Sequence, residues 1–232
     1  MFRRLLLTVA LSVGFLGCVG LWAGGKKIKV ACVGDSITEG FGIPDAQRKE
    51  FCWPSVLQKI LGDKYEVLNL GVCGNILVRD RNASWNLSAR AKELPKFKPD
   101  IIVMMLGTND SQKKAWVSEE RFESDLKKYL AEFRKINRKV KIYICYPPPS
   151  FAGQQLKMSG DSYSSAFYKK TIIPILKKVA KEEKIPTIDV FNQFKKHPEY
   201  FADGLHPNIK GADAIAKFIA AQLQKDAKKK KR

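Results

Sequence analysis

The sequence predicts a doubly wound three-layer α/β/α sandwich around a five-stranded, mostly parallel sheet. Short segments that are apolar throughout alternate with longer segments whose apolar residues recur at helical spacing. Strands that are apolar on both faces are typical of a parallel sheet covered by helices on both sides. The chain has 232 residues, of which 45% are hydrophobic and 28% charged, and this composition excludes a wholly disordered chain. One globular domain with short terminal extensions is therefore expected.

The N-terminal half supplies two strands and one helix. Residues 28–33 (IKVACV) form a short apolar run that ends at Gly34. Residues 51–61 carry apolar side chains three and four positions apart, which predicts an amphipathic helix. Residues 66–70 (EVLNL) predict the next strand, which Gly71 closes.

The C-terminal half supplies the other three strands and three helices. The expected strands are the apolar runs 100–106, which Gly107 closes, 141–146, which three prolines end, and 185–190. The expected helices are the amphipathic stretches 118–136, 168–183 and 211–224. Pro174 predicts an irregularity in the second of these helices, because proline has no backbone N–H to donate.

Residues 1–24 are predicted to be a targeting segment. Arg3 and Arg4 precede an uncharged apolar run, 5–22, which is typical of a secretory signal. The run is long enough to leave an uncleaved membrane anchor open as an alternative. Cys18 ends the stretch FLGC, which resembles a bacterial lipoprotein box, although a small apolar residue is also an ordinary component of such a run. We therefore expect an exported protein that is periplasmic, secreted or anchored as a lipoprotein.

The opposite end of the chain is strongly basic. The formal net charge is +19, and residues 225–232 form a lysine-rich segment that predicts a solvated tail. Anionic lipid or polysaccharide is a possible partner of such a tail. No aromatic residue lies within it to stack on bases, so the sequence does not indicate specific nucleic-acid binding.

The cysteines and histidines indicate neither a disulfide scaffold nor a metal site. Five cysteines in 232 residues are too sparse for a disulfide framework, and those beyond the N-terminal segment are expected to be free thiols. No HExxH motif and no Cys/His cluster with ligand spacing is present, so no metal or other cofactor is expected.

Residues suited to acyl transfer follow the predicted strands. Ser36 comes after the first strand, Gly74 after the second and Asn109 after the third, while His206 precedes the last helix. Taken singly, each has an ordinary structural interpretation as a helix cap or a turn residue. The carboxyl ends of parallel strands share one edge of the sheet, so the four residues are expected to lie together. A serine nucleophile, a histidine base and two oxyanion donors would result.

Asp203 lies three residues before His206 and can reach the imidazole across one turn. It would hold the proton on Nδ1 and leave Nε2 free as a base. The alternative is an Asx turn at the entry of the final helix. His197 has no such aspartate and is expected on the surface.

The chain resembles the SGNH (GDSL-type) hydrolase family. The resemblance rests on four segments in the family's order: VGDSITEG (33–40), NLGVCG (69–74), GTND (107–110) and DGLH (203–206). It covers about residues 27–224 and implies that 25–224 form one hydrolase domain. It also implies Ser36 as nucleophile, His206 as base and Asp203 as the acid that orients the base. The implied oxyanion hole consists of the Ser36 N–H, the Gly74 N–H and the Asn109 side chain.

A narrower resemblance points to bacterial sialate O-acetylesterase-like members of the family. It rests on the pair Trp85-Asn86 and on Tyr146 followed by three prolines. It implies Trp85 and Tyr146 as substrate-binding residues, with core packing as the alternative for Trp85. The chain departs from many members at Asn75-Ile76, where those members have threonine or serine.

The expected activity is hydrolysis of small acyl esters of carbohydrates, with acetyl as the expected acyl group. The recognisable segments leave no insertion long enough for an apolar lid, and this disfavours long acyl chains. The alternatives are a lysophospholipase or acyl-thioesterase of the same family, and a non-catalytic surface-binding protein on this fold.

Overall fold

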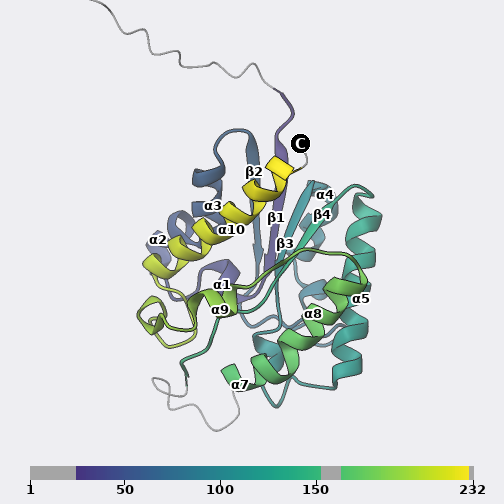
Figure 1. The fold of residues 1–232 in the computed structure, drawn as a ribbon, viewed down its shortest axis with the longest axis vertical. Helices are drawn as coiled ribbons and strands as arrows, with labels where there is room; N and C mark the ends of the chain where they lie inside the picture. Colours follow the sequence, from purple (N-terminus) through teal and green to yellow (C-terminus); the bar gives the residue numbers. More distant parts are fainter. Residues whose placement is uncertain (1–24, 153–162, 230–232) are drawn as a thin grey trace, which may run out of the picture.

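The computed structural model describes residues 25–152 and 163–229 (Figure 1). The predicted targeting segment, with Arg3, Arg4 and Cys18, lies outside the described residues, as do the last three residues of the basic tail. No helix within the described ranges is long and apolar enough to cross a membrane.

A single sheet of five strands in the order β2-β1-β3-β4-β5 forms the centre of the molecule. All neighbouring strands run parallel. The strands are β1 (Ile28–Gly34), β2 (Tyr65–Gly71), β3 (Ile101–Met105), β4 (Lys141–Cys145) and β5 (Thr187–Ile188). The predicted doubly wound α/β/α sandwich is confirmed.

Helices cover both faces of the sheet (Figure 1). The pairs are α3 with α10 on one face and α5 with α8 on the other, spanning Trp53–Leu61, Ile209–Lys229, Glu119–Ile136 and Ile173–Glu182. Successive strand residues point to opposite faces, so Val30 packs with the α3–α10 side and Ala31 with the α5–α8 side. Both residues are fully buried, which explains why the strands are apolar throughout.

Two features differ from the sequence-based expectation, and a third agrees with it. β5 has only two residues, because the Asp189 side chain accepts a hydrogen bond from the Asn192 N–H and starts α9 (Val190–Phe194). A helix that was not predicted, α2 (Asp45–Phe51), precedes α3. The predicted irregularity at Pro174 is confirmed, since a π-helical turn (Tyr168–Ile172) leads into α8.

The basic C-terminal segment is more ordered than predicted. α10 continues to Lys229, so the first five residues of the expected tail are helical. The Asp226 carboxylate accepts hydrogen bonds from Lys141 Nζ and Tyr143 Oη, each at 3.1 Å. These contacts tie the end of the helix to β4 and account for its extra length.

The remaining helical segments are short and lie in the connections. They are α1 (Ser36–Glu39), α4 (Leu94–Phe97), α7 (Ser165–Phe167) and the 3₁₀ turns Trp85–Leu87, Ala91–Glu93, Asn109–Ser111 and Pro198–Tyr200. The four cysteines in the described residues are free thiols, and of these only Cys73 is exposed.

Candidate active site

Ser36 begins α1 directly after β1. The Asp35 side chain caps this helix by accepting a hydrogen bond from the Ile37 N–H at 3.0 Å. Glycine at Gly71 lets α1 lie against the end of β2, because a Cβ there would come within 2.2 Å of the Glu39 backbone nitrogen. The close packing holds the Ser36 side chain at the carboxyl edge of the sheet, where only 3% of the residue is exposed.

Ser36, His206 and Asp203 form one continuous hydrogen-bonded chain. Ser36 Oγ lies 3.0 Å from His206 Nε2, and His206 Nδ1 lies 2.6 Å from Asp203 Oδ2. The ring of Phe41 packs edge-on against the imidazole with centroids 4.7 Å apart. The structure therefore brings together the three residues predicted as nucleophile, base and orienting acid.

The Asp203 carboxylate is held by its own loop as well as by the imidazole. Its Oδ1 atom accepts hydrogen bonds from the Leu205 N–H at 2.9 Å and the His206 N–H at 2.7 Å. Burial acts to raise the pKa of Asp203, but the hydrogen bonds from the His206 ring and from these two backbone N–H groups lower the pKa to about 2. The carboxylate is thus charged at neutral pH and can accept the proton on Nδ1.

Asp35 has the opposite electrostatic character. It is fully buried and its Oδ2 atom has no hydrogen-bond partner among the described residues. Burial raises the pKa of this carboxyl to about 7, against the lowering effect of the Ile37 N–H. Its contact with that N–H gives it a capping role beside the nucleophile.

Gly74 lies at a turn after β2 with its N–H free. The Asn75 N–H donates to the Val72 carbonyl at 3.1 Å, and Gly74 adopts a φ of 77°, which favours glycine. Within the described residues, neither the Gly74 N–H nor the Ser36 N–H donates a hydrogen bond. Both are available to an oxyanion.

Asn109 is fixed next to this turn. Its Nδ2 atom donates to the Asn75 carbonyl at 2.8 Å, which leaves the second Nδ2 hydrogen free. Its Oδ1 atom accepts a hydrogen bond from Gln112 Nε2 at 3.4 Å, so the orientation of the amide is set from both ends. The structure brings Asn109 to the Gly74 turn, as expected for a common oxyanion site.

Asp110 supports the same loop and was not singled out from the sequence. It is fully buried, and its two carboxylate oxygens accept hydrogen bonds from the Leu77 and Val78 N–H groups at 2.8 and 2.9 Å. The sequence feature that could have indicated its role is its position directly after Asn109 in the GTND segment. Asn109 and Asp110 together anchor the chain that follows Gly74.

The two predicted substrate-binding aromatics belong to the core. Trp85 is 2% exposed, donates its indole N–H to the Leu70 carbonyl at 2.9 Å, and packs edge-on against the rings of Tyr129 and Phe133. Tyr146 is 5% exposed and continues the sheet through a backbone hydrogen bond to Ile188. Neither presents a ring face to a ligand, so we correct both assignments to core packing.

His197 lies apart from this site. It is exposed, and its Nδ1 atom lies 2.9 Å from Glu199 on the same turn. In the described ranges, no group of three or more histidine, cysteine or acidic residues is arranged to hold a metal ion.

Residues 32–214 match the model of the GDSL-like lipase/acylhydrolase family. The chain belongs to this family. The predicted membership of the GDSL-type ester hydrolases is thereby confirmed.

Two curated relatives are esterases. The chain is 33% identical to an acetylxylan esterase of Xylanibacter ruminicola over 215 residues, which cover 85% of this chain and 43% of that protein. It is 27% identical to an arylesterase of Vibrio mimicus over 203 residues, which cover 85% of this chain and 88% of the relative. The chain thus spans less than half the length of the acetylxylan esterase that it resembles.

Two solved structures have a fold similar to that of this chain. A putative arylesterase from Agrobacterium tumefaciens is 26% identical and superposes with a TM-score of 0.67, covering 85% of this chain and 99% of the other. A carbohydrate acetylesterase from Sinorhizobium meliloti is 21% identical with a TM-score of 0.66, over 85% and 99% of the two chains. The latter similarity shows the fold alone.

Proposed function

We propose that the protein is a serine esterase that hydrolyses acetyl esters of carbohydrates. The observation that carries the proposal is the hydrogen-bonded chain from Ser36 Oγ through His206 to Asp203. A surface-binding protein would have no use for a base aligned on a serine at a helix N-terminus. The chemistry assigned to these residues rests on their geometry and on the resemblance of the segments that contain them.

In the first step Ser36 Oγ attacks the acyl carbon while His206 Nε2 takes its proton. The carbonyl π bond breaks, and its electron pair moves onto oxygen to give a tetrahedral oxyanion. Asp203 stabilises the imidazolium that forms, because its carboxylate faces the Nδ1 proton. The imidazolium then protonates the leaving sugar oxygen as the C–O bond breaks, which leaves acetyl-Ser36.

In the second step water replaces the sugar. His206 takes a proton from water as the water oxygen attacks the acetyl carbon, and it returns this proton to Ser36 Oγ as acetic acid departs and ionises to acetate in solvent. The oxyanion of each step is stabilised by the Ser36 and Gly74 N–H groups and the free Asn109 Nδ2 hydrogen. The Gly74 turn and the Asn109 amide are both held by hydrogen bonds, which fixes the direction of these donors.

Two observations support a carbohydrate rather than a lipid substrate. The first is the 33% identity with an acetylxylan esterase. The second is the cavity beside Gly74, whose lining combines the polar side chains of Arg81, Asn82, Gln112 and Lys114 with apolar residues and the ring of Tyr163, a mixture suited to a sugar. A lipid substrate would need a longer apolar surface, because a long acyl chain gains about 0.8 kcal/mol of binding free energy per buried CH₂ only where such a surface receives it.

The acyl preference is tested with p-nitrophenyl esters from two to twelve carbons. We expect kcat/KM to be highest for the acetyl ester and to fall for chains of eight or more carbons. Acetate release from acetylated xylosides and other neutral acetylated sugars then tests whether the leaving alcohol is a carbohydrate. An optimum at eight carbons or longer would contradict the proposal and favour the lysophospholipase or thioesterase alternative.

We also propose that the protein is exported. The support is the sequence of residues 1–24, with Arg3 and Arg4 ahead of an uncharged run. The intact mass of protein from its native host tests this, and removal of about the first 17 to 24 residues is expected from a signal of that length. A lipid-modified Cys18 would select the lipoprotein route. An unprocessed chain in the cytoplasmic fraction would contradict export.

A further inference from the structure

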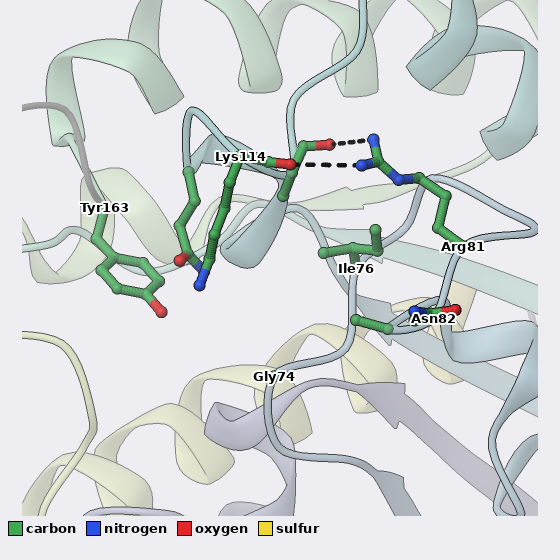
Figure 2. Close-up of a pocket in the computed structure, with 9 residues that line it drawn as sticks. Gly74, Ile76, Arg81, Asn82, Lys114 and Tyr163 are labelled. Atoms are coloured by element: carbon green, nitrogen blue, oxygen red, sulfur yellow. Dashed lines mark hydrogen bonds between the residues drawn. The ribbon is translucent and has the colours of Figure 1, made fainter.

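A cavity of about 550 Å³ opens beside the Gly74 turn. Figure 2 shows Lys114 and Tyr163 pointing into the same space, with Gly74 and Ile76 on its opposite side. This volume lies in the range of sites that bind small molecules. The cavity is therefore large enough to accept part of a substrate whose ester lies at Ser36.

The cavity is continuous with the proposed oxyanion site. Gly74 belongs to its lining, and Gln112, another lining residue, donates to the Asn109 amide oxygen at 3.4 Å. Tyr163 is a further lining residue of this cavity. Burial is the main cause that raises the pKa of the Tyr163 phenol. A sugar whose ester oxygen lies near His206 would have its neighbouring groups near this cavity.

The charged residues in the described lining of the cavity are both basic. They are Arg81 and Lys114, and no aspartate or glutamate is among the described residues that line it. The Arg81 guanidinium is fixed by donating to the carbonyls of Ala115 at 3.3 Å and Lys114 at 3.4 Å (Figure 2). The Lys114 ammonium forms no ion pair with any residue in the described part of the chain. Among the residues that the structure describes, this exposed lysine therefore has no counter-ion.

Two arginines near the Gly74 turn form ion pairs with acidic residues. Arg79, for example, forms a two-pronged ion pair with Glu132, at 2.7 Å for both contacts. Arg121 pairs with the buried carboxylate of Asp125 at 2.6 Å. These pairs stabilise the loop that follows the Gly74 turn, whereas the Lys114 ammonium pairs with no acidic residue in the described ranges.

We propose that the cavity binds a carboxylate on the sugar part of the substrate, so that the enzyme prefers acetylated glycans containing a uronic acid. The Lys114 ammonium pairs with the carboxylate, and the fixed Arg81 charge adds to the local positive potential. The Gln112 and Asn82 amides and the Tyr163 phenol provide hydrogen-bonding groups for the sugar hydroxyls. This inference deepens the proposed function, and it rests on the leaving group being a carbohydrate.

The adjacent lysine supplies a matched control. Lys113 is exposed and lines a different hollow, together with Trp116 and Phe167. Replacing Lys113 removes the same charge from the same loop without altering the cavity beside Gly74. Lys113→Met and Lys114→Met therefore separate a local effect from a change in the net charge of the protein.

The test compares two inhibitors of p-nitrophenyl acetate hydrolysis, methyl β-D-glucuronoside and methyl β-D-glucoside. The two sugars differ in having a carboxylate or a hydroxymethyl group at one carbon. We expect the glucuronoside to inhibit at about tenfold lower concentration, a ratio typical of one charge-assisted contact. Lys114→Met should reduce this ratio to within about twofold of unity, whereas Lys113→Met should leave it unchanged.

Three results would overturn the inference: equal inhibition by the two sugars, no inhibition by either, or an unchanged ratio in Lys114→Met. The ratio is measured within each enzyme, so a change in overall activity does not affect the comparison. Failure of the proposed function can be told apart from failure of this inference. If the proposed function fails, no acetate is released from any acetylated sugar, even if the glucuronoside still inhibits hydrolysis of the nitrophenyl ester.

Discussion

Replacing Asp203 by asparagine changes one atom in the proposed triad while preserving the shape of its loop. The asparagine oxygen can still accept the Leu205 and His206 N–H groups, which Asp203 Oδ1 accepts at 2.9 and 2.7 Å. Its amide NH₂ would then face His206 Nδ1, where the native carboxylate oxygen lies at 2.6 Å. Two donors cannot share this position, so the imidazole would have to place its proton on Nε2.

An imidazole protonated on Nε2 cannot accept the Ser36 proton. We expect kcat/KM for p-nitrophenyl acetate to fall roughly 10⁴-fold, which is less than the loss of about 10⁶-fold expected when a triad base is removed. The loss should be smaller because the imidazole stays beside Ser36, and a minor population protonated on Nδ1 can still accept the Ser36 proton. Activity within fivefold of the native enzyme, in a variant with a native circular dichroism spectrum, would refute the proposed role of Asp203.

The same variant has a signature in folding stability. The pKa of Asp203 is lowered from 3.8 to about 2, so its carboxylate stabilises the folded state above about pH 4. This stabilisation is lost as the pH falls through the folded-state pKa. Between pH 6 and pH 3 the contribution falls by at most about 1 kcal/mol. Urea unfolding at the two pH values should show this acid loss in the native protein and its absence in Asp203→Asn.

Three further substitutions test separate parts of the structure. Asn109→Ala should lower kcat roughly 10²–10³-fold with little change in KM, because its free amide hydrogen is assigned to charge that develops in the transition state; a raised KM with native kcat would contradict this role. Gly71→Ala should reduce the free energy of unfolding in urea by about 2 kcal/mol or more, since its Cβ would lie 2.2 Å from the Glu39 nitrogen; native stability would show that α1 can move away. Trp85→Leu should lower stability by about 2–4 kcal/mol and leave KM for acetylated sugars within about twofold, whereas a large rise in KM would restore Trp85 to the substrate site.

The strands and the principal site were predictable because local sequence determines them. A strand buried on both faces must be apolar throughout, and Val30 and Ala31 show both faces in use. In a parallel sheet the residues that follow the strands meet at one edge, so the positions of Ser36, Gly74 and Asn109 could be inferred without distances. His206 and Asp203 are only three residues apart, and their contact needs a single turn.

The remaining features depend on tertiary packing that the sequence does not reveal. Trp85 lies in an irregular stretch, yet the rings of Tyr129 and Phe133, more than forty positions away, enclose it. The helix through Lys229 persists because Asp226 contacts Lys141 and Tyr143 on a strand distant in sequence. The cavity beside Gly74 is likewise formed by separate loops. The sequence pattern therefore did not predict that Lys114 would line a cavity.

The central claim is that Ser36 is the nucleophile, and covalent labelling tests it most directly. The protein is treated with phenylmethanesulfonyl fluoride, and the intact mass, the labelled peptide and the remaining esterase activity are measured together. We predict one adduct on Ser36, loss of activity in proportion to labelling, no such adduct in Ser36→Ala and much slower labelling in His206→Ala. A folded Ser36→Ala variant that retains esterase activity, or inactivation through an adduct on a different serine, would contradict the account.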